Sequence, residues 1–218
     1  MKIFTAIPVA EIPSEMDLSV TYIDNTHGGF DLSAKLNYAM DSAKKANADW
    51  LCFRHDDLTI ETPDLIEPQL KQAEVDNVRV AGVIGTLALQ SSLQWWQPTR
   101  NIHGAGAIVQ GFKNGQPDSV MADWPGYHTG LASIDGCVLW VHKDMFDHHV
   151  MEGFARWFYD VQICVEALLL GYRVGTLDVR CRHQSEGGFD MSDYVEKRDR
   201  LMQHYQQIKL SFPVIGRI

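Results

Sequence analysis

The sequence predicts an α/β fold in which helices flank a mostly parallel central sheet. Short apolar runs bounded by Pro, Asn and Gly alternate along the chain with longer segments whose apolar residues recur at helical spacing. This alternation is typical of proteins in which helices cover a parallel sheet. The chain has 218 residues, of which 45% are hydrophobic, and a chain of this length can bury one substantial core. We therefore expect a single domain over residues 1–218.

The first half of the chain is expected to supply strands and two helices. A helix begins near residue 32 with Asp31 or Ser33 as its N-cap. A second helix has Thr62 as its cap and Pro63 in its first turn, and its inward face begins with Leu65. Apolar runs that end in loops predict the strands, which are residues 2–9, 20–24, 49–53 and 78–86.

The second half begins with an unusual segment, residues 90–132, which is rich in Gly, Gln and Trp. We expect it to be irregular, and loops of this length are commonly functional, so it is a candidate lid over a ligand. Beyond it, strands are predicted over 133–142 and 172–183. A helix closed by Gly171 lies between them, and an amphipathic helix at about 192–210 ends the chain.

The composition limits the classes of partner and the cellular location. A formal charge of -9 and a pI near 5.4 give no electrostatic reason to bind nucleic acid or an anionic membrane. The start of the chain has too few apolar residues for a signal peptide, and no segment approaches the ~20 apolar residues of a membrane span. We expect a cytoplasmic protein. Four widely spaced cysteines are expected to be reduced and buried, namely Cys52, Cys137, Cys164 and Cys181.

Acidic residues gather where the predicted strands end. The segment WLCFRHDDL shows this most clearly, because a buried strand stops in a histidine and two adjacent aspartates. Neighbouring aspartates repel each other, so in a pocket they favour a cation, and oxygen ligands favour Mg²⁺ or Mn²⁺. In parallel sheets, ligands bind at the carboxyl ends of the strands. The candidate residues are Asp24, Asp56, Asp57, Asp135, Asp160 and His183.

The order of four motifs resembles the glycosyltransferase family 2 superfamily, especially its StrF-like branch. The motifs are H-D-D, D-G-x-V-L-W-V, F-Y-D-V-x-I-C-x-E-A-L-L-L-G-Y-R-V and C-R-H-Q-S-E-G-G, and the resemblance spans about residues 20–190. It implies a GT-A (Rossmann-like) fold, a nucleotide-sugar donor and a divalent metal, Mn²⁺ or Mg²⁺. It also implies transfer with inversion at the anomeric carbon.

The resemblance further implies roles on the donor side. Asp57 corresponds to the last carboxylate of a D-x-D-type motif, which holds the metal that bridges the donor diphosphate. Asp56 takes the middle position, and His55 stands where many relatives have the first aspartate. Asp24 corresponds to the residue that contacts the nucleotide base or ribose. His183 corresponds to a late ligand of the metal or the diphosphate.

On the acceptor side, Asp160 corresponds to the catalytic base. Sugar transfer from a diphosphate builds negative charge on the leaving group, which a metal stabilises as a Lewis acid. The incoming hydroxyl must also lose its proton, which a carboxylate can accept. The aromatic faces of several tryptophans offer stacking surfaces for a sugar ring or base. They are Trp95, Trp96, Trp124 and Trp157, of which the first two are equally consistent with a core position.

Each polar candidate also has a purely structural explanation. Asp160 would serve as a helix cap, Asp57 as a turn residue, and His183 as a histidine whose hydrogen bonds are satisfied in the core. His55 would hydrogen-bond a loop. Asp135 is expected to be a turn residue or part of an acceptor wall rather than a catalyst.

Three functions from different classes follow from these residues. The first is a metal-dependent glycosyltransferase, with a UDP-sugar as the favoured donor and a glycan, a small metabolite or a modified DNA base as acceptor. The second is a metal-dependent nucleotidyltransferase or phosphohydrolase, because carboxylates and a histidine around a metal also serve phosphoryl chemistry. The third is a non-catalytic module that binds a nucleotide-sugar.

Overall fold

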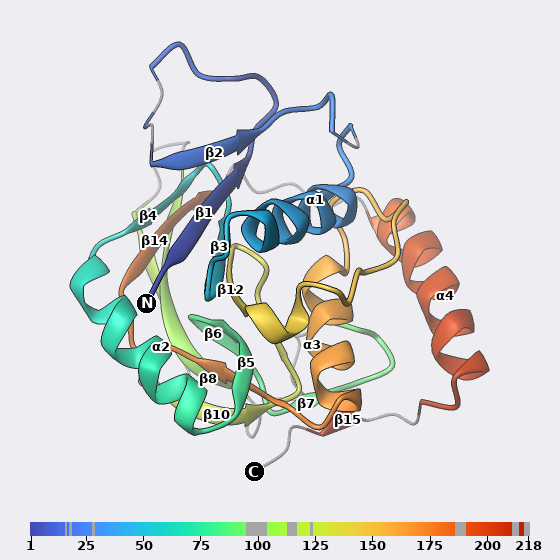
Figure 1. The fold of residues 1–218 in the computed structure, drawn as a ribbon. Helices are drawn as coiled ribbons and strands as arrows, with labels where there is room; N and C mark the ends of the chain where they lie inside the picture. Colours follow the sequence, from blue (N-terminus) through green and yellow to red (C-terminus); the bar gives the residue numbers. More distant parts are fainter. Residues whose placement is uncertain are drawn as a thin grey trace.

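A computed structural model describes residues 1–15, 17, 19–27, 29–94, 104–112, 117–122, 124–185, 191–210 and 214–215. Within these residues, the largest element is a seven-stranded sheet with the order β10-β13-β5-β12-β3-β1-β2 (Figure 1). Its strands are β1 (Ile3–Pro8), β2 (Val20–Ile23), β3 (Trp50–Arg54), β5 (Val78–Gly82), β10 (His128–Leu131), β12 (Val138–His142) and β13 (Arg173–Thr176).

The central sheet is mostly parallel, as the sequence predicts. Strand β1 pairs in parallel with β2 and with β3, and β5 pairs in parallel with β13. Strand β12 lies between the two groups and runs antiparallel to both β3 and β5, and β10 is antiparallel at one edge. The carboxyl ends of the parallel strands therefore share one edge of the sheet, which is where ligands bind in such folds.

Helices flank the sheet on both faces. They are α1 (Leu32–Lys45), α2 (Ile66–Val75), α3 (Tyr159–Leu169) and α4 (Met191–Gln207) in the described chain. Alternate residues of β3 point to opposite faces: Leu51 and Phe53 join the core cluster that contains α1, α3 and α4, whereas Trp50 and Cys52 join the cluster that contains α2. Figure 1 shows α2 apart from the other three helices. These features are consistent with the GT-A fold implied by the sequence.

The described residues also form a second, six-stranded sheet. It contains β4 (Leu58–Ile60), β6 (Ile84–Thr86), β8 (Gly104–Phe112), β9 (Ser119–Ala122), β11 (Ser133–Ile134) and β14 (Cys181–Ser185), and a separate pair joins β7 (Ala88–Leu89) to β15 (Val214–Ile215). Each of the predicted strands 78–86, 133–142 and 172–183 is two strands, one in each sheet. The prediction of single strands was wrong because an apolar run does not show where the chain crosses between sheets.

Glycines allow the chain to cross closely at these points. A Cβ at Gly85 would lie 2.8 Å from Cα of Ile134, and one at Gly106 would lie 2.8 Å from the carbonyl carbon of Val83. Such distances are too short for a real side chain, so the close packing of β6 against β11 and β8 depends on glycine at both positions.

Several local predictions were also wrong. Residues 90–132 are not one irregular segment, since β8, β9 and β10 lie within them, and residues 95–103, with Trp95 and Trp96, are outside the described chain. Thr62 is at the N-cap position with Pro63 in the first turn, as predicted, but the capped element is a 3₁₀ turn, and Oγ1 of Thr62 accepts from the backbone N–H of Arg180 instead of making a capping hydrogen bond. Leu65 is 39% exposed rather than inward, because a 3₁₀ turn, Pro63–Leu65, precedes α2.

Other local predictions are confirmed. Asp31 is the N-cap of α1 and accepts from the N–H of Ser33 at 3.0 Å. Gly171, with a φ of 89°, follows the C-terminus of α3. All four cysteines are buried free thiols. No helix in the described part of the chain is both long enough and apolar enough to cross a membrane.

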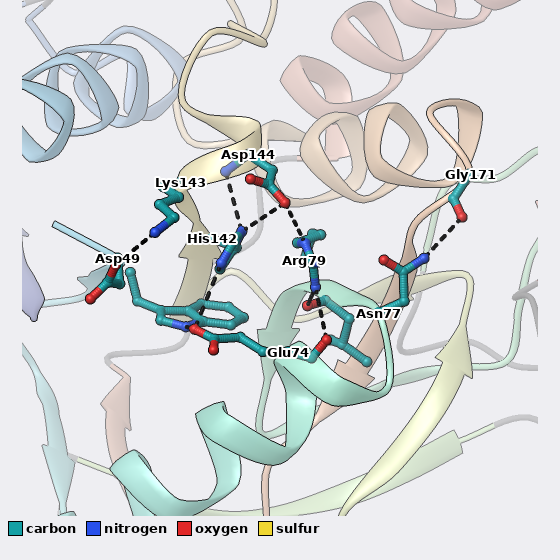
Figure 2. Close-up of polar contacts among 10 residues, drawn as sticks. Asp49, Glu74, Asn77, Arg79, His142, Lys143, Asp144 and Gly171 are labelled. Atoms are coloured by element: carbon teal, nitrogen blue, oxygen red, sulfur yellow. Dashed lines mark hydrogen bonds and ion pairs between the residues drawn. The ribbon is translucent and has the colours of Figure 1, made fainter. Parts of the chain in front are cut away.

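A polar network ties the opposite edge of the sheet together (Figure 2). His142 ends β12 and pairs with Trp50, the first residue of β3, so this network lies away from the carboxyl ends of the parallel strands. Arg79 donates from Nε to Asp144 at 2.7 Å, and Nδ1 of His142 lies 3.2 Å from the same carboxylate. A cavity of about 440 Å³ adjoins the network. Because its charges are paired across β5 and β12, we interpret it as structural.

We expect Arg79→Met to lower the free energy of unfolding by ~1–2 kcal/mol, since a charge-assisted hydrogen bond at a half-buried site is lost. Urea denaturation measures this loss. The control is Lys71→Met, which removes an exposed pair with Glu67 and should cost ~0.5 kcal/mol or less. Equal losses in the two variants would contradict a structural role for the network.

Candidate active site

The candidate site is built around the turn Asp135–Cys137, which joins β11 to β12. Because β12 runs antiparallel to β3 and Val138 pairs with Arg54, this turn lies beside the segment that follows β3. The backbone N–H of His55 donates to the carbonyl of Cys137 at 2.9 Å. Register alone therefore brings residues about 80 positions apart to the carboxyl edge of the sheet.

Three of the predicted residues, His55, Asp57 and His183, converge at this edge. His183 comes from β14, where it pairs with Leu58 of β4, and the N–H of Gln184 donates to the carbonyl of Asp57. Nε2 of His183 lies 3.2 Å from Oδ1 of Asp57 and 3.4 Å from Nδ1 of His55. The remaining separation, from Nδ1 of His55 to Oδ1 of Asp57, is 4.0 Å.

The donor set of this cluster fits a divalent metal. Three atoms separated by these distances can all lie ~2.1 Å from one ion, the usual length of a bond from imidazole nitrogen or carboxylate oxygen to a transition metal. Exclusion of water by the surrounding protein, and then the neighbouring His183, lower the pKa of His55 to about 4. Its imidazole is therefore neutral at neutral pH, the form that binds metals.

Asp160 lies in the first turn of α3 rather than ahead of the helix, and its side chain is 9% exposed. Its Oδ2 accepts from the N–H of Gly136 at 3.0 Å, and its Oδ1 from the N–H of Val161 at 2.8 Å. The N-cap of α3 is Phe158, so the interpretation of Asp160 as the helix cap was wrong, and its Oδ1 instead satisfies a backbone N–H within the first turn. The other oxygen holds the turn of the candidate site. Burial, reinforced by Asp135, raises the pKa of Asp160 to about 7.

Asp135 is a turn residue, one of the two roles expected for it. Its Oδ1 accepts from the N–H of Cys137 at 3.0 Å, which closes a local side-chain turn. Burial raises the pKa of Asp135, whereas the hydrogen bond from Cys137 and the nearby His183 lower it. Asp135 therefore interacts electrostatically with His183 of the metal-capable cluster and with Asp160.

Asp24 and Asp56 do not join the cluster of His55, Asp57 and His183. Asp24 follows β2 and accepts from the N–H of Thr26 at 2.9 Å. Asp56 is exposed. Both carboxylates raise the pKa of Lys35, against the larger effect of burial, which lowers it. They therefore lie around the carboxyl ends of β1 and β2, beside the cluster.

Sequence reasoning missed two residues of this region, Lys35 and Tyr159. Lys35 is 3% exposed, and its Nζ donates to the carbonyl of Val9 and to Oδ1 of Asn25. Its position on α1 resembles that of an ordinary surface lysine, so nothing in the sequence indicates that Lys35 is buried. The hydroxyl of Tyr159 lies 2.9 Å from Nε2 of His55. The sequence signal that could have identified Tyr159 is its position directly before Asp160, in the motif that begins F-Y-D-V.

The described tryptophans do not line this cluster. Trp157 donates from Nε1 to Asp193 of α4, and its ring meets that of Tyr194 edge-on, so it attaches α4 to the fold. Trp124 is largely exposed and lies against His128 at a ring distance of 4.1 Å. Stacking of a sugar or base on these two rings therefore stays a prediction.

Fold and site together define an α/β protein with a metal-capable cluster at the carboxyl edge of a mostly parallel sheet. The chain belongs to the glycosyltransferase like family, whose model matches residues 2–205. This membership confirms the superfamily-level resemblance seen in the sequence, whereas the StrF-like branch stays a prediction. A search of curated proteins found no match.

Solved structures give weaker comparisons. A197 from STIV is 13% identical, with 85% of this chain and 86% of that chain covered and a TM-score of 0.47. The CMP:2-keto-3-deoxy-manno-octonic acid synthetase complexed with CTP is 12% identical, with coverages of 94% and 100% and a TM-score of 0.41. Similarity at this level carries no argument about function.

The raised pKa of Asp160 predicts a specific dependence of stability on pH. The carboxyl keeps its proton in the folded state up to about pH 7, but in the unfolded state only up to about its ordinary value of 3.8. The folded state thus binds more protons between these values, so this group's contribution to the free energy of unfolding falls as pH rises through the window. Asp160→Asn should lack this fall.

Urea denaturation of wild type and Asp160→Asn at pH 4, 5.5, 7 and 8 measures the effect. The difference between the two proteins isolates Asp160 from all other titrating groups. We expect the variant to gain stability relative to wild type as pH rises. Parallel profiles across this range would show that the pKa of Asp160 is ordinary.

Proposed function

We propose that the protein is a metal-dependent glycosyltransferase that moves a sugar from a nucleotide-diphosphate sugar to an acceptor hydroxyl with inversion. The observation that carries the proposal is the position of two different chemical groups on one turn. A metal-capable cluster and a buried carboxylate are both hydrogen-bonded to the backbone of residues 135–137, the former through His55 and the latter through Asp160. Membership of the glycosyltransferase like family supports the same reaction class.

His55, Asp57 and His183 are proposed to hold the metal. The bound ion would supply Lewis-acid stabilisation of the charge that develops on the diphosphate leaving group. Asp24 and Asp56 are proposed to contact the donor nucleotide, with a UDP-sugar as the favoured donor. Lys35, between the ends of β1 and β2, adds a buried positive charge to the same region and supports binding of an anionic nucleotide there.

Asp160 is proposed to be the general base. A pKa of about 7 suits this role, because a base near the working pH combines a substantial ionised fraction with proton affinity. The carboxylate would accept the proton of the acceptor hydroxyl on Oδ1 or Oδ2 as the oxygen attacks the anomeric carbon. The acceptor is proposed to be a glycan or a small metabolite, with a modified DNA base a less favoured choice.

The donor set also predicts which metal is preferred. Two imidazole nitrogens and one carboxylate suit first-row transition metals, whereas Mg²⁺ prefers oxygen ligands. We therefore expect Mn²⁺ to bind more tightly than Mg²⁺. The same ligands would serve a nucleotidyltransferase or phosphohydrolase. The buried Asp160 favours sugar transfer, because hydroxyl activation needs a base on the acceptor side.

Asp57→Ala should weaken Mn²⁺ binding by at least the ~10–100-fold that loss of an outer-shell partner costs a metal site. It should also abolish the Mn²⁺ dependence of UDP binding. Calorimetry with Mn²⁺, Mg²⁺ and EDTA measures both. The matched control is Asp56→Ala, which removes the exposed neighbouring carboxylate and should leave Mn²⁺ affinity within about twofold. Equal UDP affinity in EDTA and in Mn²⁺ would exclude the metal role.

Asp160→Asn should reduce sugar transfer by ~10²–10⁴-fold, the usual contribution of a general base, and leave donor and Mn²⁺ affinity unchanged. Turnover is measured with UDP-, GDP- and dTDP-sugars and candidate acceptors, beside the melting temperature. The wild-type product should have the inverted anomeric configuration. Transfer within tenfold of wild type would remove Asp160 from the mechanism. Release of pyrophosphate or free phosphate without sugar transfer would favour the phosphoryl-transfer alternative.

A further inference from the structure

The hydroxyl of Tyr159 makes two short contacts inside the candidate site. Its oxygen lies 2.7 Å from the carbonyl oxygen of Gly136 and 2.9 Å from Nε2 of His55. Tyr159 itself is 3% exposed. A phenol hydroxyl has one hydrogen to donate, and its oxygen can also accept.

Proton counting decides how these contacts are arranged. A backbone carbonyl only accepts hydrogen bonds, so the contact at 2.7 Å requires the Tyr159 hydroxyl to donate to Gly136. If the hydroxyl donated to His55 instead, two acceptor oxygens would face each other at that distance. The phenol oxygen must then accept from His55, which places the imidazole proton on Nε2.

A proton on Nε2 leaves the lone pair of a neutral imidazole on Nδ1. That atom faces Nε2 of His183 and Oδ1 of Asp57 at 3.4 and 4.0 Å. We propose that Tyr159 is a positioning residue that holds His55 in the Nε2–H tautomer, so that His55 binds the metal through Nδ1. This inference rests on the proposed metal site. It adds Tyr159, which would not itself touch the metal, and it specifies Nδ1 of His55 as the ligating atom.

A second observation shows that the position of Tyr159 is built into the fold. A Cβ at Gly136 would lie 2.5 Å from Cζ of Tyr159 and closer still to its hydroxyl oxygen. The phenol can therefore approach the turn only because residue 136 is glycine. Phe158, which directly precedes Tyr159 in the chain, has a φ of +64°. Such a conformation is costly for a non-glycine residue, and it directs the chain into α3 with Tyr159 facing the turn.

Hydrogen bonds of this kind are common at metal sites, where the ring nitrogen of a histidine ligand that does not bind the metal donates to an oxygen. The partner is usually a carboxylate, a carbonyl or water. Here the structure assigns the role to a neutral phenol, which passes the hydrogen bond on to a carbonyl. This arrangement fixes the ring without adding negative charge beside the half-buried Asp135 and the buried Asp160.

The tautomer can be measured directly in metal-free protein. Two-bond ¹H–¹⁵N spectra of ¹⁵N-histidine-labelled protein distinguish Nε2–H from Nδ1–H, and His55→Gln assigns the signal. We expect Nε2–H for His55 in the wild type. In Tyr159→Phe, Nε2 loses its acceptor while Nδ1 still faces Asp57, so the population should shift toward Nδ1–H. An Nδ1–H tautomer in the wild type, or an unchanged tautomer in the variant, would overturn the inference.

Metal affinity gives the second readout. Tyr159→Phe should bind Mn²⁺ ~10–100-fold more weakly than wild type, and pulsed EPR should show weaker ¹⁴N coupling from one of the two imidazoles. The matched control is Tyr194→Phe, which removes a buried hydroxyl that donates to the carbonyl of Ser92 at 2.7 Å and should leave both measurements unchanged. Gly136→Ala, which displaces the phenol, should reproduce the effect of Tyr159→Phe if its far-ultraviolet spectrum is native.

The outcomes separate this inference from the proposed function. Mn²⁺ affinity of Tyr159→Phe within twofold of wild type would overturn the positioning role even if sugar transfer is observed. Wild-type protein that binds no Mn²⁺ would overturn the positioning role and the metal site together. Intact metal binding with the expected tautomer, but without sugar transfer, would support the inference and count only against the proposed reaction.

Discussion

The main chain of the turn Asp135–Cys137 is the constraint on which the candidate site depends. The carbonyl of Cys137 fixes the backbone of His55, the N–H of Gly136 binds Asp160, and the carbonyl of Gly136 binds Tyr159. Backbone groups at a buried turn must find partners, and here the partners are the polar residues of the site. The hydrogen bonds that satisfy the backbone groups of the turn are therefore the same ones that hold the residues of the site in place.

The arrangement also explains how two neighbouring carboxylates, the half-buried Asp135 and the buried Asp160, tolerate each other. The charge of Asp135 disfavours ionisation of Asp160, and burial is the main cause that raises the pKa of each carboxyl. Each accepts from backbone N–H groups of the turn or of α3, and such bonds favour the charged form. Because burial raises the pKa of Asp160 and the hydrogen bonds lower it, the resulting pKa is about 7. A carboxyl with a pKa near 7 is thus a consequence of where the turn lies, and it is also what proton transfer at neutral pH requires.

The sequence predicted the sheet, its mostly parallel order and a group of polar residues where strands end, because strand ends can be located from apolar runs and share one edge. It assigned the metal to Asp57 and His183 and a donor contact to His55, whereas the structure brings His55 together with the other two. It did not predict the second sheet, since the crossings between sheets occur inside continuous apolar runs such as 78–86. It also missed Tyr159. That role arises from a contact with Gly136, 23 residues away, and neither local periodicity nor residue type indicates which aromatic side chain meets which glycine.

Histidine at position 55 changes the electrostatics of the site as well as its donor atoms. The resemblance places an aspartate there in many relatives, and an imidazole in its place removes one negative charge. Burial holds the pKa of His55 at about 4, so this imidazole is neutral at neutral pH, and Asp57 is the only carboxylate of the described cluster. A divalent ion held there would keep more of its positive charge than one held by carboxylates alone. Stronger attraction for the diphosphate of a donor follows directly, because fewer protein charges compete with it.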